Sequence, residues 1–236
     1  MAHLGDHIHP TPERRRSATI DAPPPSCPLC GYHGPFRPHK RTGRPDASCG
    51  RCGARERHRL FALYLHGCGV ASWAGAKVLH VSPEYFIAPF FADAALYLTA
   101  DLADSGADIR ADLTHLALAD AAFDAMLCSH VLEHIEDDTA AIAEIHRILK
   151  PGGIALINVP LDPGLAETYE DSAIASPEGR AAHFGQFDHV RRYGMDFPRR
   201  LATAGFDVTA YRGTRGQRAR HAIHDATILY LARKRR

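Results

Sequence analysis

The stretch FDAMLCSHVLEHIEDDTAAIAEIHRILKPGG, residues 123–153, decides the fold class. Its first part is an apolar run that ends on Ser129 and His130, as a buried strand does at its carboxyl end. An amphipathic pattern at helical spacing follows, with Asp137 or Asp138 as the N-terminal cap and Pro-Gly-Gly as the predicted stop. A buried strand that leads directly into an amphipathic helix is typical of α/β proteins.

The same alternation of strand and helix extends to both sides of this stretch. Further strands are predicted at 78–81, 95–101, around 109–113, 153–160, 205–211 and 226–234. Short buried strands that alternate with helices indicate a parallel α/β sheet. Ligands of such sheets bind beyond the carboxyl ends of the strands. We therefore expect functional side chains where these strands end.

Polar residues stand at several of these ends. Asp101 follows the second strand, where a carboxylate can accept both hydroxyl groups of a ribose. Asp112 can accept a hydrogen bond from an exocyclic amine, with Leu113 against the ring. Each residue alone is a weak signal, whereas their order and spacing together predict a nucleoside-containing ligand.

Five motifs in this order resemble the class I S-adenosylmethionine (SAM)-dependent methyltransferases, of the methyltransferase-11-like type, over about residues 74–234. The motifs are KVLHVSPE, LTADL, ADLTHLALADAAFDAMLCSHVLEHIEDD, EIHRILKPGGIALINVP and DHVRRYGMDFPRRLATAGF. The resemblance implies a Rossmann-like seven-stranded sheet whose last strand inserts antiparallel, and SAM as the cofactor. It also implies Asp101 on the ribose, Asp112 near the adenine, and the backbone of 128–130 beside the methyl-bearing sulfur.

The first motif departs from this family, which usually has an acidic residue and a glycine-rich turn after the first strand. Here the turn carries Ser82, Pro83 and Glu84. SAM has no phosphate to cradle, so Glu84 is predicted to meet its ammonium group. Pro83 is predicted to begin a helix whose free N–H groups meet the carboxylate. A domain that no longer binds the cofactor is the alternative. The predicted cofactor-binding residues are His80, Ser82, Glu84, Asp101, Asp112, Leu113, Cys128, Ser129 and His130.

Two Cys-x2-Cys pairs separated by 18 residues predict a metal site near the N-terminus. The predicted ligands are Cys27, Cys30, Cys49 and Cys52. Four thiolates complete a tetrahedral shell, so the ion would be structural Zn²⁺, with iron as a minor alternative. This head resembles the zinc-ribbon-like module of a bacterial methyltransferase subgroup. Cys68 and Cys128 lie outside the pattern and are expected in the core.

The charge distribution is uneven although the net charge is only +1. Residues 26–60 hold eight Lys and Arg against two acidic residues, and residues 212–236 hold eight against one. The intervening segment is acidic. The basic segments are expected to dock on the acidic domain or to be solvated, and a surface for phosphate or nucleic acid is the alternative. The run at 212–220 is either a solvated loop or a clamp for an anionic acceptor.

A long segment, about 161–204, is predicted to form a lid over the methyl acceptor. Its predicted substrate-binding residues are Glu170, Gln186, Asp188, Arg191 and Tyr193. Phe184 and Phe187 could wall a pocket. Histidine suits removal of the acceptor's proton at neutral pH. His189 is the preferred base or acceptor clamp, followed by His130 and then His183.

The domain map predicted from the sequence is a disordered leader at 1–25, a zinc module at 26–59, a linking helix at 60–73 and a methyltransferase domain at 74–236. The helical stripe of the linking segment includes Val70. The leading hypothesis is methyl transfer to an O or N atom of a small molecule or a glycan or lipid precursor. An RNA methyltransferase that holds RNA with its basic zinc module is the second hypothesis, and a non-catalytic zinc-dependent binding protein is the third. Without a signal core or a long apolar run, a cytoplasmic location is expected.

Overall fold

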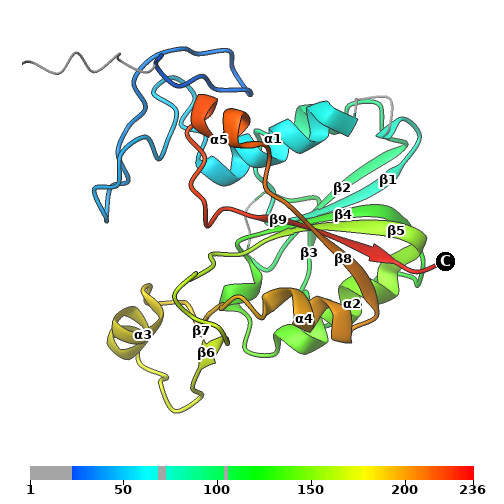
Figure 1. The fold of residues 1–236 in the computed structure, drawn as a ribbon. Coiled ribbons are helices and arrows are strands. Elements are labelled where there is room, and N and C mark those ends of the chain that lie inside the picture. Colours follow the sequence, from blue (N-terminus) through cyan, green and yellow to red (C-terminus); the bar gives the residue numbers. More distant parts are fainter. Residues whose placement is uncertain (1–22, 69–72, 104–105) are drawn as a thin grey trace, which may run out of the picture.

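The computed structural model describes residues 23–68, 73–103 and 106–236, and its centre is a seven-stranded sheet (Figure 1). The strands are β1 (Lys77–Val81), β2 (Leu96–Asp101), β3 (Ile109–Arg110), β4 (Phe123–Ser129), β5 (Leu149–Asn158), β8 (Phe206–Tyr211) and β9 (Leu229–Lys234). Their order is β3-β2-β1-β4-β5-β9-β8. β9 pairs antiparallel with β5 and β8, whereas the other pairs are parallel. The predicted Rossmann-like sheet with an antiparallel last strand is confirmed.

Helices cover both faces of the sheet. They are α1 (Glu56–Cys68), α2 (Asp138–Ile148), α3 (Pro177–Phe184), α4 (Phe197–Thr203) and α5 (Arg215–Arg220), with 3₁₀ turns η2 (Ala88–Phe91) and η3 (Leu132–His134). Figure 1 shows α1 and α5 on one side and α2 and α4 on the other. No helix in the described part of the chain is long and apolar enough to cross a membrane.

Successive strand residues face opposite layers, which gives the domain two cores. Val78 of β1 is buried in the core that α1 covers, and the next residue, Leu79, is buried in the core that α2 covers. Leu127 and Met126 of β4 divide in the same way. Burial on both faces explains why these strands read as continuous apolar runs rather than alternating ones.

Helix α2 begins as predicted and ends earlier. The Asp137 side chain caps it by accepting a 2.9 Å hydrogen bond from the Ala140 N–H. The helix ends at Ile148, and Leu149 is already extended as the first residue of β5, paired with Phe123. The Pro-Gly-Gly sequence therefore lies inside β5, and its predicted role as the stop of this helix is wrong.

The helix predicted to start at Pro83 is absent from the described residues. The chain after β1 forms a bend and a turn, and the next helical element is the 3₁₀ turn η2. Ile87, Phe90 and Phe91 are buried in this short segment, against the layer that contains α1. Packing of three bulky side chains over so few residues takes the place of a regular helix, so N–H groups of a helix at Pro83 are not available to a ligand.

The remaining segments differ in detail from their predicted boundaries. The predicted linking helix begins earlier, at Glu56, and its last described residue is Cys68. Val70 and residues 1–22 of the predicted leader lie outside the described residues. The segment 161–204, which we call the lid, holds the small strands β6 (Tyr169–Glu170) and β7 (Arg191–Arg192) as well as α3 and α4. The basic run at 212–220 contains α5, whose N-terminus has a capping box at Thr214.

Candidate functional site

Four thiols converge near the N-terminus. The Sγ atoms of Cys27 and Cys52 are 3.8 Å apart, and those of Cys30 and Cys49 are 3.7 Å apart. A tetrahedral Zn²⁺ with Zn–S bonds of about 2.3 Å holds its sulfurs about 3.8 Å apart, so the cluster has the size of a zinc site.

Glycine shapes both halves of this cluster. Gly31 and Gly53 have φ values of +68° and +78°, which residues with a Cβ rarely adopt. The N–H group of Gly31 donates to the carbonyl of Cys27, and that of Gly53 donates to the carbonyl of Cys49, each at 3.0 Å. These matching turns bring the two thiols of each pair toward one point.

The cysteine module, residues 26–55, is fastened to the domain by the fully buried side chain of Arg59. Its guanidinium group donates to carbonyl oxygens of Asp46, Ala47 and Ala54 in the module, at 2.7 to 3.3 Å. It also donates to the carbonyls of 221 and 222, both at 2.7 Å, directly after α5. One side chain thus joins the module, α1 and the basic C-terminal segment.

The carboxyl ends of β1 and β4 form the expected cofactor position. Val81 pairs with Cys128, so the residues that follow the two strands lie side by side. Ser82 and His130 have φ values of +50° and +55°, an unusual conformation for residues with a Cβ. The Ser129 hydroxyl is buried and makes no hydrogen bond with a described residue. An orphaned donor between two strained strand ends fits a polar ligand such as SAM.

Glu84 lies beside these strand ends and is held by α1. Its Oε1 accepts hydrogen bonds from Nε and Nη2 of Arg57, at 2.8 and 2.6 Å, and lies 2.6 Å from Nε2 of His58. Burial opposes ionisation, yet these partners lower the pKa of Glu84 to about 2. Its Oε2 is buried without a partner among the described residues, which fits an additional cationic ligand group.

The other predicted cofactor residues differ in how far contacts within the protein already occupy their side chains. Asp112 uses Oδ1 for the N–H and hydroxyl of Thr114, both at 2.8 Å, and these bonds lower its pKa. Oδ1 of Asp101 accepts from the Ala103 N–H. His80, in contrast, is buried, and its Nδ1 lies 2.7 Å from the Tyr97 hydroxyl.

Leu113 and Cys128 are both buried in the core that α2 covers. Burial raises the pKa of the Cys128 thiol. Its side chain is therefore a core group, and only its backbone borders the strand end.

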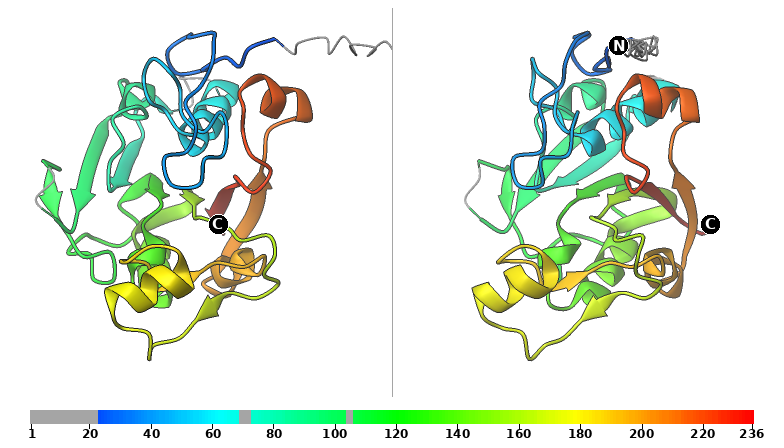
Figure 2. Two further views of the ribbon diagram at one scale, coloured as in Figure 1. Left: turned by 90° about the vertical axis from the view of Figure 1, so that its left-hand side faces the viewer. Right: turned by 60° about the vertical axis from the view of Figure 1, so that its left-hand side comes forward.

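A cavity of about 540 Å³ opens beyond the carboxyl ends of β4 and β5. Its walls come from the loop after β4, from the lid, and from the cysteine module with the start of α1. Figures 1 and 2 show the module, drawn in blue, and the α3 segment, drawn in yellow, on opposite sides of this end of the sheet. Arg41 of the module donates to the Gly185 carbonyl of the lid, so the two walls touch. A site between these walls is partly shielded from water.

The lining of the cavity combines imidazoles with guanidinium groups. The His and Arg side chains that line it are His39, Arg41, Arg44, Arg55, Arg57, His130, His134, His189 and His224. Arg44 and Arg57 are neutralised by Glu56 and Glu84. The Arg55 guanidinium makes no hydrogen bond or ion pair with a residue in the described ranges. Arg55 therefore presents to the cavity a guanidinium group that no carboxylate of the described residues pairs with.

The predicted substrate-binding residues fall into two groups. Gln186 lines the cavity, and its amide donates to Oδ1 of Asp188 at 2.9 Å. Glu170, Arg191 and Tyr193 do not line it. A substrate role for these three stays a prediction, and their observed contacts are within the protein.

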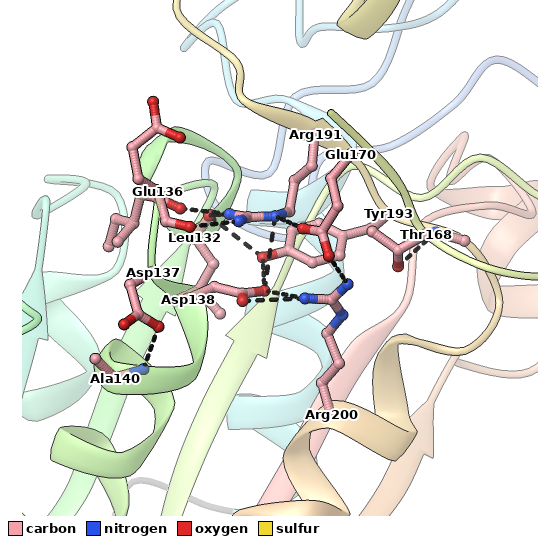
Figure 3. A network of polar contacts seen from close by, with 12 residues as sticks. Leu132, Glu136, Asp137, Asp138, Ala140, Thr168, Glu170, Arg191, Tyr193 and Arg200 are labelled. Carbon is pink, nitrogen blue, oxygen red and sulfur yellow. Dashed lines mark hydrogen bonds and ion pairs between the residues drawn. The ribbon is translucent and has the colours of Figure 1, made fainter. Parts of the chain in front are cut away.

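Figure 3 shows these contacts as a network that clamps the lid to the loop after β4. Arg191, which is 4% exposed, donates to the carbonyls of Leu132, Ile135 and Glu136. The Tyr193 hydroxyl donates to Oδ2 of the buried Asp138 at 2.7 Å. Glu170 then bridges Arg191 and Arg200, at 2.8 and 2.6 Å.

This clamp fixes the position of the neighbouring catalytic candidates. His189 and His130 line the cavity, and burial lowers the pKa of His189. His183 lies on α3 with Nδ1 2.8 Å from the Tyr169 hydroxyl and does not line the cavity. Phe184 is buried beside Tyr169, whereas Phe187 is 62% exposed. Neither phenylalanine lines this cavity, so an aromatic wall built from them stays a prediction.

The sequence reasoning did not identify several lining residues. Glu133 and His134 are two of them. Arg55 and His39 belong to the basic segment 26–60. Their position over the strand ends depends on how the cysteine module packs on the domain, which the sequence does not show. The excess of positive charge in 26–60 was the available signal.

Comparisons with known proteins agree with this fold. Residues 67–157 match the family model of the methyltransferase domain. An arsenite methyltransferase of Aquipseudomonas alcaligenes is 31% identical over 102 residues, 42% of this chain and 30% of that protein. A probable SAM-dependent methyltransferase of Mycolicibacterium smegmatis is 30% identical over 102 residues, 43% of this chain and 35% of that protein. The chain thus spans about a third of the length of these relatives.

The fold extends beyond the segment matched by sequence. The crystal structure of a SAM-dependent methyltransferase from Mesorhizobium loti superposes with a TM-score of 0.53 at 19% identity, covering 74% of this chain and 98% of that one. Residues 67–157 therefore match a methyltransferase domain, the chain shares its fold with a solved SAM-dependent methyltransferase, and a four-cysteine cluster lies at its N-terminal side.

Proposed function

We propose that this protein transfers the methyl group of SAM to an oxygen or nitrogen atom of an anionic small molecule, such as a glycan or lipid precursor. The observation that carries the proposal is the cavity beyond β4 and β5, where imidazoles face the guanidinium group of Arg55. A phosphate or carboxylate group of the acceptor would pair with Arg55. Its nucleophilic atom would then lie among the histidines.

The proposed SAM site rests on buried polar atoms that have no hydrogen-bond partner among the described residues. SAM supplies an electrophilic methyl group on a sulfonium. Glu84 would use its free Oε2 for the ammonium group, and the Ser129 hydroxyl would serve a second polar group. Asp101 and Asp112 would hold the ribose and adenine, as their strand-end positions allow.

The proposed acceptor site must align the nucleophilic atom of the acceptor with the methyl group of SAM. Methyl transfer needs the nucleophile in line with the breaking carbon–sulfur bond, so a held acceptor reacts faster than a free one. His189 and His130 line the cavity and would hold the acceptor atom or take its proton. Gln186 and Asp188 would orient this part of the lid.

The cysteine cluster would hold structural Zn²⁺. Four thiolates leave no open coordination position, so the ion would stabilise the module rather than take part in methyl transfer. The module in turn brings Arg41 and Arg55 to the cavity. Zinc would therefore act on acceptor binding through the fold of the module.

Calorimetry with the zinc-loaded protein is the first test. Binding of SAM and S-adenosylhomocysteine is expected, and failure of both to bind would overturn the proposal. Methyl transfer from labelled SAM is then measured with pairs of acceptors that differ only in a phosphate or carboxylate group. Arg55→Ala should raise KM for the anionic member about tenfold, which corresponds to about 1.4 kcal/mol. Arg51→Ala is the matched control, because Arg51 belongs to the same module but does not line the cavity.

RNA is the second candidate acceptor, supported by the basic residues that the module contributes to the cavity. The aromatic residues of the module argue against it. Phe36 is 6% exposed, with the guanidinium carbon of Arg59 4.7 Å from its ring centre, so it offers no open face to a base. RNA binding that weakens steeply with salt and is lost in Arg55→Ala would favour RNA over a small anion.

A further inference from the structure

Three potential metal ligands meet at one side of the acceptor cavity. They are the carboxylate of Glu133 and the imidazoles of His134 and His189, and one ligand atom from each lies within 4.8 Å of the others. Glu133 and His134 belong to η3, directly after β4. His189 comes from the loop between α3 and β7. The Val190 N–H donates to the Glu133 carbonyl at 2.9 Å and ties these two segments together.

Glu133 is the unusual member of the cluster. It is fully buried, and neither carboxylate oxygen makes a hydrogen bond with a described residue. Nδ1 of His130 lies 3.0 Å from Oε1, close enough for an ion pair but without hydrogen-bond geometry. Burial of a carboxylate without hydrogen bonds is costly unless a cation compensates it.

The imidazole of His134 is oriented by a neighbouring residue of the lid, Asp188. Nδ1 of His134 lies 3.2 Å from the carbonyl oxygen of Asp188 and 3.3 Å from its Oδ2. Gln186 in turn fixes Asp188 through the other carboxylate oxygen. The His189 ring packs edge-on against the His134 ring, with the ring centroids 4.8 Å apart. Metal-binding histidines commonly hold one ring nitrogen against a protein oxygen in this way and offer the other to the ion.

The size of the cluster is close to that of a metal shell. Bonds of about 2.0–2.2 Å from a metal to nitrogen and oxygen place two ligand atoms at most about 4.4 Å apart. The ligand atoms of the cluster lie within 4.8 Å of one another, so at most small side-chain rotations bring them into this range. Its backbone is already fixed by the Val190 contact and by the lid clamp of Arg191.

From these contacts we infer that Glu133, His134 and His189 bind a divalent transition-metal ion in the acceptor cavity. Two imidazoles and one carboxylate suit ions such as Mn²⁺ and Fe²⁺ and leave coordination positions open toward the cavity. Ion binding itself does not depend on the proposed function.

The chemical role of the ion does rest on the proposed function. A hydroxyl group of the acceptor would occupy an open position and release its proton to water more easily. The oxygen–carbon bond would then form as the carbon–sulfur bond of SAM breaks. The products are the methylated acceptor, S-adenosylhomocysteine and one proton. His189 would in that case act as a ligand rather than as the base.

Mn²⁺ is the probe of choice for protein loaded with only one Zn²⁺ per chain, which the four thiolates take up first. Thiolates bind Zn²⁺ more tightly than Mn²⁺, so Mn²⁺ leaves the cysteine cluster unchanged. Electron paramagnetic resonance titration should show one saturable Mn²⁺ per chain. Glu133→Gln, His134→Asn and His189→Asn should each weaken it at least tenfold. His183→Asn is the matched control, because His183 lies in the lid outside the cavity.

S-Adenosylhomocysteine affinity, measured on the same samples, separates the possible failures. Loss of Mn²⁺ with retained S-adenosylhomocysteine binding supports the inference. His134→Asn decides the matter if Glu133→Gln does not fold, since the His134 side chain is 32% exposed. A wild-type protein that binds S-adenosylhomocysteine but no Mn²⁺ overturns the metal site alone. One that binds Mn²⁺ but no S-adenosylhomocysteine overturns the proposed function alone.

Discussion

Arg57 of α1 forms an ion pair with Glu84, with Nη2 2.6 Å from Oε1, and thereby fixes the turn that follows β1. This pair connects the helix next to the cysteine module with the predicted cofactor site. It also commits one carboxylate oxygen of Glu84 and leaves the other buried without a described partner. The turn without glycines is thus organised around an acidic side chain that is held in place from the adjacent helix.

Replacement of Glu84 by glutamine tests whether that free oxygen meets the cofactor. Glu84→Gln should weaken SAM binding at least tenfold, or about 1.4 kcal/mol, because an amide lacks the charge that an ammonium group needs. Isothermal titration calorimetry measures the change. Glu56→Gln is the control, since Glu56, the first residue of α1, is also a buried carboxylate that pairs with an arginine, Arg44. Equal SAM affinity of Glu84→Gln and wild type would remove Glu84 from the cofactor site.

The sheet and the cysteine cluster could be predicted because local sequence encodes them. Buried parallel strands read as apolar runs, and thiol spacing defines a knuckle without reference to the rest of the chain. The acceptor cavity depends instead on tertiary folding. Glu133 and His189 are far apart in sequence and meet because the lid folds back through Arg191 and Tyr193. Dependence on tertiary packing also explains why the helix predicted to start at Pro83 is wrong. There, packing of η2 against the layer that contains α1 overrides the preference of proline for a helix start.

Metal removal tests the structural role of the cysteine cluster. Cys49→Ser should lower the zinc content from one ion per chain toward zero, because three thiolates bind Zn²⁺ more weakly than four. It should also lower the midpoint of thermal unfolding, since ion binding contributes folding free energy in small modules. Cys68→Ser is the control, because Cys68 lies outside the cluster and its replacement should leave one zinc per chain. Full zinc content in Cys49→Ser would contradict a four-thiolate site.

Arg59 should be a major contributor to stability. Its guanidinium group serves five carbonyl oxygens from three parts of the chain, and alanine would leave these buried acceptors unpaired. We expect Arg59→Ala to lower the free energy of unfolding by at least about 3 kcal/mol. Lysine, with three donors, should recover part of the loss. Urea denaturation measures both, and Arg51→Ala should stay within about 0.5 kcal/mol of wild type. A similarly small effect in Arg59→Ala would mean that the module is held by other contacts.

His80 should make stability depend on pH. Burial lowers its pKa from 6.5 to about 4, so between these values the unfolded chain holds a proton that the folded protein lacks. The contribution of neutral His80 is complete above pH 6.5, and the free energy of unfolding should fall as the pH decreases toward 4. His80→Phe should reduce this slope by up to one proton, or about 1.4 kcal/mol per pH unit. Urea denaturation at several pH values measures the slope.

Tyr97→Phe provides the matched control for His80. It removes the 2.7 Å contact between the Tyr97 hydroxyl and Nδ1 of His80 but keeps the buried imidazole. The variant should therefore be less stable at every pH, because a buried hydrogen bond is lost, while most of the slope between pH 4 and 6.5 remains. Other buried histidines titrate alike in the wild type and in both variants, so the comparison isolates His80. Parallel pH profiles for wild type and His80→Phe would show that His80 is protonated equally in the folded and unfolded states.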